Sequence, residues 1–235
     1  MVETMHKSSN RSVPVYDSLR QAIIEQALKP GVKLPEDSIG ETFGVSRTIV
    51  RNALVRLDSE GLVDLRPNRG ASVAEPTIEE AHDIFEMRQC LEGEVVRRLC
   101  GMDPAPVVKA LDTHLAEEQE CLGKSAARSI RLAGEFHILL AELTGSPILA
   151  KYVNEIVSRC SLIVARFAVA HSAECGVEEH AEIIAAIANG DGDRAATCMF
   201  SHLRGVQDRA LLEPEDVRAE NVADILSRYR LQMSD

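Results

Sequence analysis

Residues 43–57 have the sequence FGVSRTIVRNALVRL, and this stretch decides the fold of the first part of the chain. A short helix is predicted before it, over residues 35–43, and a longer one within it, over residues 46–58. Ser46 suits the N-terminal cap of the longer helix, because its hydroxyl can accept a hydrogen bond from a free backbone N–H. Only Gly44 and Val45 connect the two helices. Two helices joined by so short a turn are typical of a helix-turn-helix.

The helix predicted over residues 46–58 has two chemically different faces. At about 100° per residue, one face is apolar, with Ile49, Val50, Ala53, Leu54 and Leu57. The opposite face carries Arg47, Thr48, Arg51, Asn52 and Val55. The N-terminal end of such a helix enters the major groove of DNA, where arginine binds guanine O6 and N7 and asparagine binds adenine. The alternative is a polar face that is merely solvated, on a small helical domain.

A short hairpin is predicted directly after this helix. Gly61 ends the helix, residues 62–66 and 71–73 are predicted strands, and residues 67–70 form the turn. Arg66 and Arg69 lie at the tip, where they suit contacts with DNA phosphates or the minor groove. Gly70 permits close approach of the backbone. With a further helix predicted over residues 15–28, these elements form a winged helix-turn-helix.

This part of the chain, over about residues 14–75, closely resembles the winged helix of GntR-family bacterial repressors. The matching segments are residues 34–36, 43–57, 60–63 and 67–73. The resemblance implies DNA contacts from Arg47, Thr48, Arg51 and Gly70. Asn52 stands where the family usually has glutamate, which changes the expected base preference. Asp37 stands where the family often has a basic residue, which removes an expected contact. The full set of predicted DNA-binding residues is Ser46, Arg47, Thr48, Arg51, Asn52, Arg66, Arg69 and Gly70.

The charge of the chain is divided unevenly. The 235 residues contain 26 Lys and Arg against 37 Asp and Glu, a net charge of −11. Residues 1–76 are neutral, with 10 of each sign, so the whole excess of acid lies in residues 77–235. A neutral first part can present a local basic patch, because charges act on DNA only within a Debye length of about 8–10 Å. The acidic second part is expected to suppress non-specific DNA binding.

Composition also excludes several classes of protein. No stretch has the roughly 18 consecutive apolar residues of a membrane helix, and the N-terminal residues lack the apolar core of a signal peptide. We therefore expect a cytoplasmic protein with no membrane partner. Six cysteines without a CxxC pair favour reduced core residues over a disulfide framework or a zinc knot. The sequence has no HExxH, P-loop, GxSxG or GxGxxG motif, which argues against an enzyme.

Residues 77–235 are predicted to form an all-helical domain. It follows a flexible N-terminus over residues 1–13 and a DNA-binding domain over residues 14–76, with the boundary at residues 75–77. Between breaks rich in Gly and Pro, apolar residues recur with helical spacing. Six or seven helices are predicted, at about residues 77–101, 104–123, 126–144, 147–171, 176–189, 192–212 and 217–230. The fold class is therefore mainly α, a winged helix-turn-helix followed by a helical bundle that can enclose a ligand.

Four polar residues fall on apolar faces of these helices. His137, His180 and His202 each lie on the inward face of a separate helix. Neutral imidazole is the commonest metal ligand, and three histidines with an open position suit a divalent ion such as zinc. The alternative is three histidines that hydrogen bond within the core. Arg88 lies in an apolar stripe and suits the grip of a carboxylate or phosphate, unless it forms an i,i+4 pair with Glu92.

This second part resembles the FCD effector domain of the same repressor family, over about residues 77–212. The matching segments are residues 85–93, 135–137, 145–147, 179–187, 190–191 and 202–203. The resemblance implies that the three histidines bind a metal, often zinc, beside a small organic acid. Ala133 replaces the family's usual aspartate ligand, and Glu135 belongs to another face of the helix. The predicted site is therefore three histidines completed by water or a ligand carboxylate, with Arg88 as the effector-binding residue.

The sequence thus predicts a ligand-responsive transcriptional regulator. A homodimer would bind a palindromic operator in double-stranded DNA, and a small carboxylate metabolite would release it. Whether the effector releases or promotes DNA binding is not decided by the sequence. Two other classes stay open, a metal-dependent helical enzyme fused to a DNA-binding domain and a DNA-binding protein without an effector. Steady substrate turnover would favour the enzyme, and ligand-insensitive DNA affinity would favour the last class.

Overall fold

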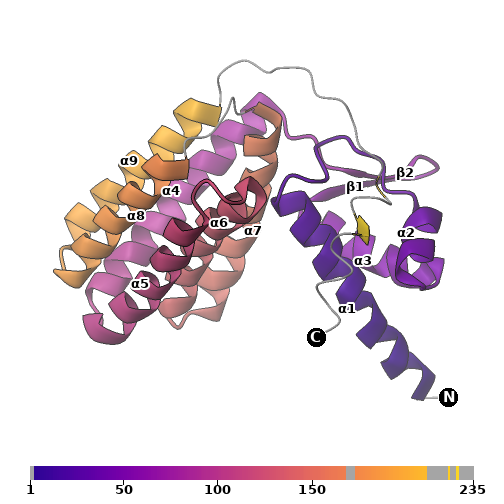
Figure 1. The fold of residues 1–235 in the computed structure, drawn as a ribbon, viewed down its shortest axis with the longest axis horizontal. Coiled ribbons are helices and arrows are strands. Elements are labelled where there is room, and N and C mark those ends of the chain that lie inside the picture. Colours follow the sequence, from indigo (N-terminus) through magenta and orange to yellow (C-terminus); the bar gives the residue numbers. More distant parts are fainter. Residues whose placement is uncertain (1–2, 168–172, 211–221, 223–225, 228–235) are drawn as a thin grey trace. The chain divides into compact units, whose positions relative to one another are not determined.

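The computed structural model describes residues 3–167, 173–210, 222, 226 and 227, with only the backbone course of residues 3–13 and 173–175. The chain divides into two compact units, Met1–Pro76 and Thr77–Pro214. Figure 1 labels the elements of each unit. The helix predicted over residues 217–230 falls almost wholly outside the described residues.

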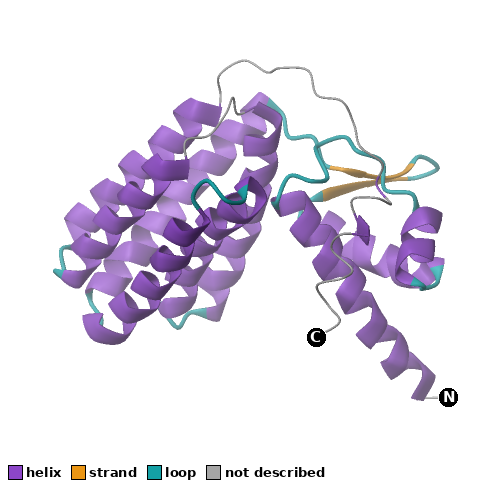
Figure 2. Cartoon of the chain, in the orientation of Figure 1, coloured by secondary structure: helices purple, strands orange, loops and turns teal. Residues whose placement is uncertain are grey.

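The first unit contains three helices and a two-stranded wing (Figure 2). The helices are α1 (Glu3–Ile24), α2 (Glu36–Phe43) and α3 (Arg47–Ser59), and the strands are β1 (Val63–Arg66) and β2 (Gly70–Val73). α3 packs against α1, α2 and β1. Its predicted apolar face, Ile49, Val50, Ala53, Leu54 and Leu57, is buried in this core. The predicted winged helix-turn-helix is confirmed.

Helix α1 differs from its prediction at both ends. It begins at Glu3 and runs through Pro14, whereas the helix was predicted over residues 15–28. Proline inside a helix removes one backbone hydrogen bond, which is why the pattern favoured a start after Pro14. At the other end, Gln26 has a φ of 60°, and Leu28 donates its backbone N–H to the carbonyl of Ala22 at 2.9 Å. This left-handed turn ends the helix before the Pro30-Gly31 pair.

The turn between α2 and α3 is tight because glycine stands at two positions. Gly44 has a φ of 64°, in the left-handed region. A Cβ on Gly40 would lie 2.9 Å from the carbonyl oxygen of Val45, so a side chain there would force a shift. Val45 returns a backbone hydrogen bond to the carbonyl of Gly40 at 2.9 Å. These contacts set the direction in which α3 leaves the turn.

Ser46 is the N-cap of α3 by position, but its hydroxyl makes no capping hydrogen bond. The prediction of a side-chain cap was therefore wrong. The carbonyl of Ser46 instead begins the helical ladder by accepting from the backbone N–H groups of Ile49 and Val50. The first N–H groups of a helix have no partner within it. Since Ser46, Arg47 and Thr48 are exposed, water or an anion can accept from their N–H groups.

The wing is a short antiparallel hairpin, as predicted. Val63 lies opposite Val73, and Arg66 lies opposite Gly70. Asn68 and Gly70 have φ values of 61° and 76°, so the turn uses two residues that tolerate the left-handed region. The hairpin therefore holds Arg66 and Arg69 at its exposed end.

The second unit is a bundle whose six described helices agree with the first six predicted helices. They are α4 (Ile78–Cys100), α5 (Pro104–Cys121), α6 (Ala126–Leu143), α7 (Pro147–Phe167), α8 (Ala173–Ala188) and α9 (Gly192–Ala210). Five begin at side-chain caps: Thr77 and Glu80 form a capping box, and Asp103, Ser125, Ser146 and Asp191 each accept from a backbone N–H. Within the described residues, none of these helices has the length and apolar content needed to cross a membrane.

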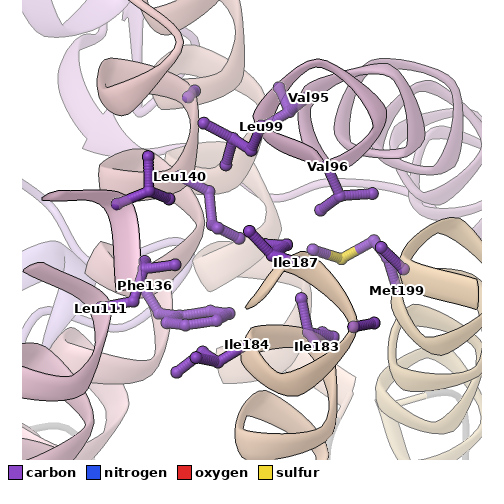
Figure 3. Packing of buried hydrophobic residues seen from close by; sticks show 14 of the residues in the cluster. Val95, Val96, Leu99, Leu111, Phe136, Leu140, Ile183, Ile184, Ile187 and Met199 are labelled. Atoms are coloured by element: carbon purple, nitrogen blue, oxygen red, sulfur yellow. The ribbon is translucent and has the colours of Figure 1, made fainter. Parts of the chain in front are cut away.

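The core of this unit joins side chains from all six of its described helices, with Val153 and Val157 coming from α7. Figure 3 shows Val95, Val96 and Leu99 of α4, Leu111 of α5, Phe136 and Leu140 of α6, Ile183, Ile184 and Ile187 of α8, and Met199 of α9. Phe136 is fully buried, and its ring stacks on that of His180 at a centroid distance of 3.9 Å. Because Phe136 is held in this core, its neighbour His137 on the same helix is held in place as well.

Candidate metal centre and DNA-reading face

The three predicted histidines come together inside the helical unit. His137 of α6, His180 of α8 and His202 of α9 are each at most 4% exposed. One ring nitrogen from each lies within 4.8 Å of the others. The Nε2 atoms of His137 and His202 are 3.2 Å apart. Three imidazole nitrogens at such separations could hold one metal ion.

Each histidine also has a carboxylate beside its Nδ1 atom. Glu92 of α4 lies 2.5 Å from Nδ1 of His137. Glu118 of α5 lies 2.9 Å from Nδ1 of His180, and Glu179 of α8 lies 2.6 Å from Nδ1 of His202. An Nδ1–H that donates to a carboxylate leaves the lone pair of the ring on Nε2. The arrangement therefore favours the tautomer that presents Nε2 to a metal.

Two nitrogens of this cluster make no hydrogen bond within the described structure. One is Nδ1 of His137, which lies 2.5 Å from the Glu92 carboxylate without hydrogen-bond geometry, and the other is the buried Nε2 of His180. An unpaired buried polar atom costs free energy, so it marks a position that a bound group would fill. Three neutral imidazoles are a donor set that zinc and similar divalent ions accept. The residues present therefore fit a metal.

Burial keeps the imidazoles of His137 and His202 neutral. It lowers the pKa of His137 to about 3, although the nearby Glu92 carboxylate works in the opposite direction. Burial also lowers the pKa of His202 to about 4, although the neighbouring Glu179 carboxylate acts to raise it. Only the neutral ring binds a metal. The two histidines thus need no deprotonation at neutral pH.

Two of the carboxylates stay ionised although they are buried. Burial by itself would raise the pKa of Glu92, but the Arg88 guanidinium outweighs it and the pKa falls to about 2. Burial also opposes the ionisation of Glu118, yet contacts with His114 and His180 lower its pKa to about 2. Negative charge therefore surrounds the imidazole cluster.

Arg88 is buried, with an exposed fraction of 4%, and its guanidinium is already engaged. Its Nε donates to Glu92 at 2.6 Å, and one terminal nitrogen donates to the sulfur of Cys160 at 3.3 Å. The i,i+4 ion pair between Arg88 and Glu92, which was the alternative to a ligand-binding arginine, is therefore present. An effector carboxylate would have to share this guanidinium with Glu92.

Other parts of the predicted site are arranged as follows. Ala133 supplies no ligand atom, and Glu135 binds Arg131 at 2.8 Å on the same helix. Glu179 of α8 was not among the predicted site residues, but its carboxylate contacts His202. Glu118 was missed, although Leu111, Leu115 and Glu118 follow the spacing of one buried helix face. A carboxylate on such a buried face could have indicated that Glu118 belongs to a buried polar site.

The cysteines are all thiols among the described residues, but they are not uniformly core residues. Cys121 and Cys160 are buried, Cys100 and Cys198 are partly exposed, and Cys90 is exposed. The side chain of Cys175 lies outside the described residues.

The polar face of α3 is exposed, opposite the buried one. Arg47, Thr48, Arg51 and Asn52 all lie on it. The side chains of Arg47 and Arg51 are both 71% exposed. Arg47 forms an ion pair with Asp37, and Arg51 lies 4.0 Å from Glu36, so both face the first turn of α2. In the wing, Arg66 pairs with Asp64 at 3.1 Å, while Arg69 and Gly70 are exposed at the turn.

Residues 83–205 match the FCD domain family, and residues 11–73 match the family described as bacterial regulatory proteins, gntR family. The chain belongs to the GntR family and carries an FCD domain. Both resemblances found in the sequence are thereby confirmed. The gntR match contains the whole exposed face of α3 and the wing, and the FCD match contains all three clustered histidines.

Proteins similar to this GntR chain are regulators of transcription. The transcriptional repressor RspR of Escherichia coli is 24% identical over 88% of this chain and 90% of its own length. The Uxu operon regulator of Haemophilus influenzae is 30% identical over 85% of this chain and 81% of its own length. The protein is therefore a transcriptional regulator and not an enzyme.

Solved structures of GntR proteins have the same fold. A GntR transcriptional regulator from Rhodococcus sp. RHA1 has a TM-score of 0.71 and 28% identity, and the match covers 86% of this chain and 97% of that one. Escherichia coli McbR/YncC has a TM-score of 0.73 and 22% identity over 83% of this chain and 94% of its own.

Proposed function

We propose that this GntR regulator is a homodimeric repressor that binds an operator through α3 and the wing and leaves it when a small carboxylate binds the FCD domain. The observation that carries the proposal is the pairing of an exposed arginine face on α3 with a buried three-histidine cluster in the second unit. Two α3 helices related by a dimer twofold would suit a palindromic operator in bacterial DNA.

In the proposed DNA complex, the N-terminal half of α3 supplies the base contacts. Arg47 and Arg51 would each bind a guanine through O6 and N7, Asn52 would bind adenine, and Ser46 and Thr48 would bind phosphate or base edges. Arg66, Arg69 and Gly70 of the wing would approach the backbone or the minor groove.

In the FCD domain, His137, His180 and His202 would hold the ion, which we propose to be zinc. A bound divalent ion would supply positive charge for an anionic effector. The chain itself contributes neutral rings, a buried setting and no fourth ligand at Ala133. A carboxylate that binds there and alters DNA affinity needs a coupling free energy of about 1–3 kcal/mol, which is typical of allosteric proteins.

The test of this function combines site selection from a random DNA library with a binding assay on the selected site. Wild-type protein is expected to enrich a palindrome, and Arg47→Ala and Arg51→Ala are each expected to weaken binding about 5- to 150-fold, from about 1–3 kcal/mol per guanine contact. Arg98→Ala is the matched control, because Arg98 is an exposed arginine that pairs with Glu94 in the second unit.

Failure to enrich any sequence, or full binding by both arginine variants, would overturn the proposed DNA contacts. A selected site whose affinity does not respond to a panel of small carboxylates, with zinc present, would instead favour a DNA-binding protein without an effector.

A further inference from the structure

We propose that Glu92, Glu118 and Glu179 are positioning residues, which orient the three imidazoles toward the ion and place around them the negative charge that Ala133 does not supply. This inference rests on the proposed metal site. It concerns three carboxylates that were not among the predicted metal-site residues.

The three carboxylate contacts share one geometry. In each pair the carboxylate and the imidazole belong to different helices: Glu92 of α4 with His137 of α6, Glu118 of α5 with His180 of α8, and Glu179 of α8 with His202 of α9. All three contacts use the same ring atom, Nδ1. Three unrelated buried histidines would not need a common orientation. A shared metal needs one, because each ring must present Nε2.

Each carboxylate is itself held by another group. Glu92 accepts from Arg88 at 2.6 Å, Glu118 lies 3.2 Å from Nε2 of His114, and Glu179 lies 3.5 Å from Arg209. These contacts fix the carboxylates before any ion binds. Groups that contact the far side of metal-bound histidines set the orientation and basicity of the rings.

Carboxylate charge also lies close to the cluster. Glu92 and Glu118 are at most 4% exposed, so their charges are poorly screened by water. Arg88 and Arg209 offset part of this charge, and His114 lies against Glu118. Carboxylates favour a divalent cation, as a directly bound aspartate does in other sites, but here they act from behind the imidazoles and not as ligands.

The test measures zinc affinity of the full-length protein by competition with a chromophoric chelator, for wild type and for Glu92→Gln, Glu118→Gln and Glu179→Gln. Each variant is expected to lose about 10- to 100-fold in affinity, the usual cost of removing such a partner. Glutamine can also donate to Nδ1, which favours the tautomer that carries its proton on Nε2. Glu179→Asp, which keeps the carboxylate, is expected to recover part of the affinity.

Glu135→Gln is the matched control, because Glu135 lies two residues from His137 but pairs with Arg131. Melting temperatures of the metal-free proteins identify any variant that fails to fold, and Glu179, the most exposed of the three, provides the variant least at risk. The absorption spectrum of bound Co²⁺ reports coordination directly. Folded variants with wild-type zinc affinity and an unchanged cobalt spectrum would overturn this inference and leave the metal site standing. A wild-type protein that binds no metal would overturn the metal site, and this inference with it.

Discussion

Asp37→Asn is expected to strengthen DNA binding. Asp37 forms an ion pair with Arg47, and both side chains are more than half exposed. To reach a guanine or a phosphate, Arg47 must exchange this carboxylate for the DNA. The carboxylate also stands close to where the phosphates of a bound duplex would lie, since it belongs to the helix that precedes the reading helix.

The size of the effect follows from the exposure of the pair. Exposed ion pairs contribute about 0.2–1 kcal/mol, so removing the competitor is expected to raise the affinity of Arg47 for DNA about 1.4- to 5-fold. The gain should shrink as salt rises, because it is electrostatic. This gain in affinity depends on charge and not on the DNA sequence, so we expect it with operator DNA and with random DNA alike.

The assay is fluorescence anisotropy of a labelled duplex titrated with protein at several salt concentrations. Glu41→Gln is the matched control, because Glu41 is exposed on the same helix and has no ion pair among the described residues. If Asp37→Asn binds DNA more weakly than wild type, the carboxylate orients Arg47 and does not compete with the DNA. If Asp37→Asn and Glu41→Gln change DNA affinity equally, the ion pair between Asp37 and Arg47 has no role in DNA binding.

Three further predictions concern stability. Burial, followed by the hydrogen bond to Glu60, raises the pKa of Tyr16 from 10.0 to about 12; the unfolded chain therefore loses this proton first, and the free energy of unfolding should fall by up to about 2 kcal/mol as pH rises between these values. Denaturant titrations across that range should show a shallower fall for Tyr16→Phe. Thr77→Ala removes the capping box with Glu80 and should cost about 1 kcal/mol in urea unfolding, whereas an unchanged midpoint would mean that the cap adds nothing. Removing zinc with a chelator should lower the melting temperature, since an ion at 100 times its Kd stabilises the folded state by about 2.7 kcal/mol; equal melting temperatures with and without zinc would contradict this.

Local sequence signals were enough to predict most of the fold. The winged helix and the first six helices of the second unit follow from caps, glycine turns and apolar spacing, which act within a few residues of each position. The predicted start of α1, after Pro14, was wrong. Proline is a local signal against a helix, but α1 continues through it. The side-chain cap at Ser46 was wrong because a capping residue type does not guarantee a capping bond when the N–H groups lie at an exposed surface.

The candidate metal site was only partly predictable. Helical spacing indicates that His137, His180 and His202 face inward, but it contains no information on which helices meet or at what distance. The carboxylate partners depend on those meetings, because each comes from a helix other than that of its histidine. Glu118 carried a signal in its apolar neighbours, whereas Glu179 is partly exposed and carried none.

Native mass spectrometry of the full-length protein, purified without chelator or affinity tag, tests whether the three histidines hold a metal ion in a dimer. It reports the number of subunits, the mass of any metal and any retained small molecule together. The account predicts a dimer that carries about one zinc-sized mass per chain, and the same metal should be lost from a His180→Ala variant that still forms the dimer. A dimer that stays metal-free after incubation with zinc would contradict it, and would show that three imidazoles and their carboxylates do not hold an ion without an aspartate at position 133.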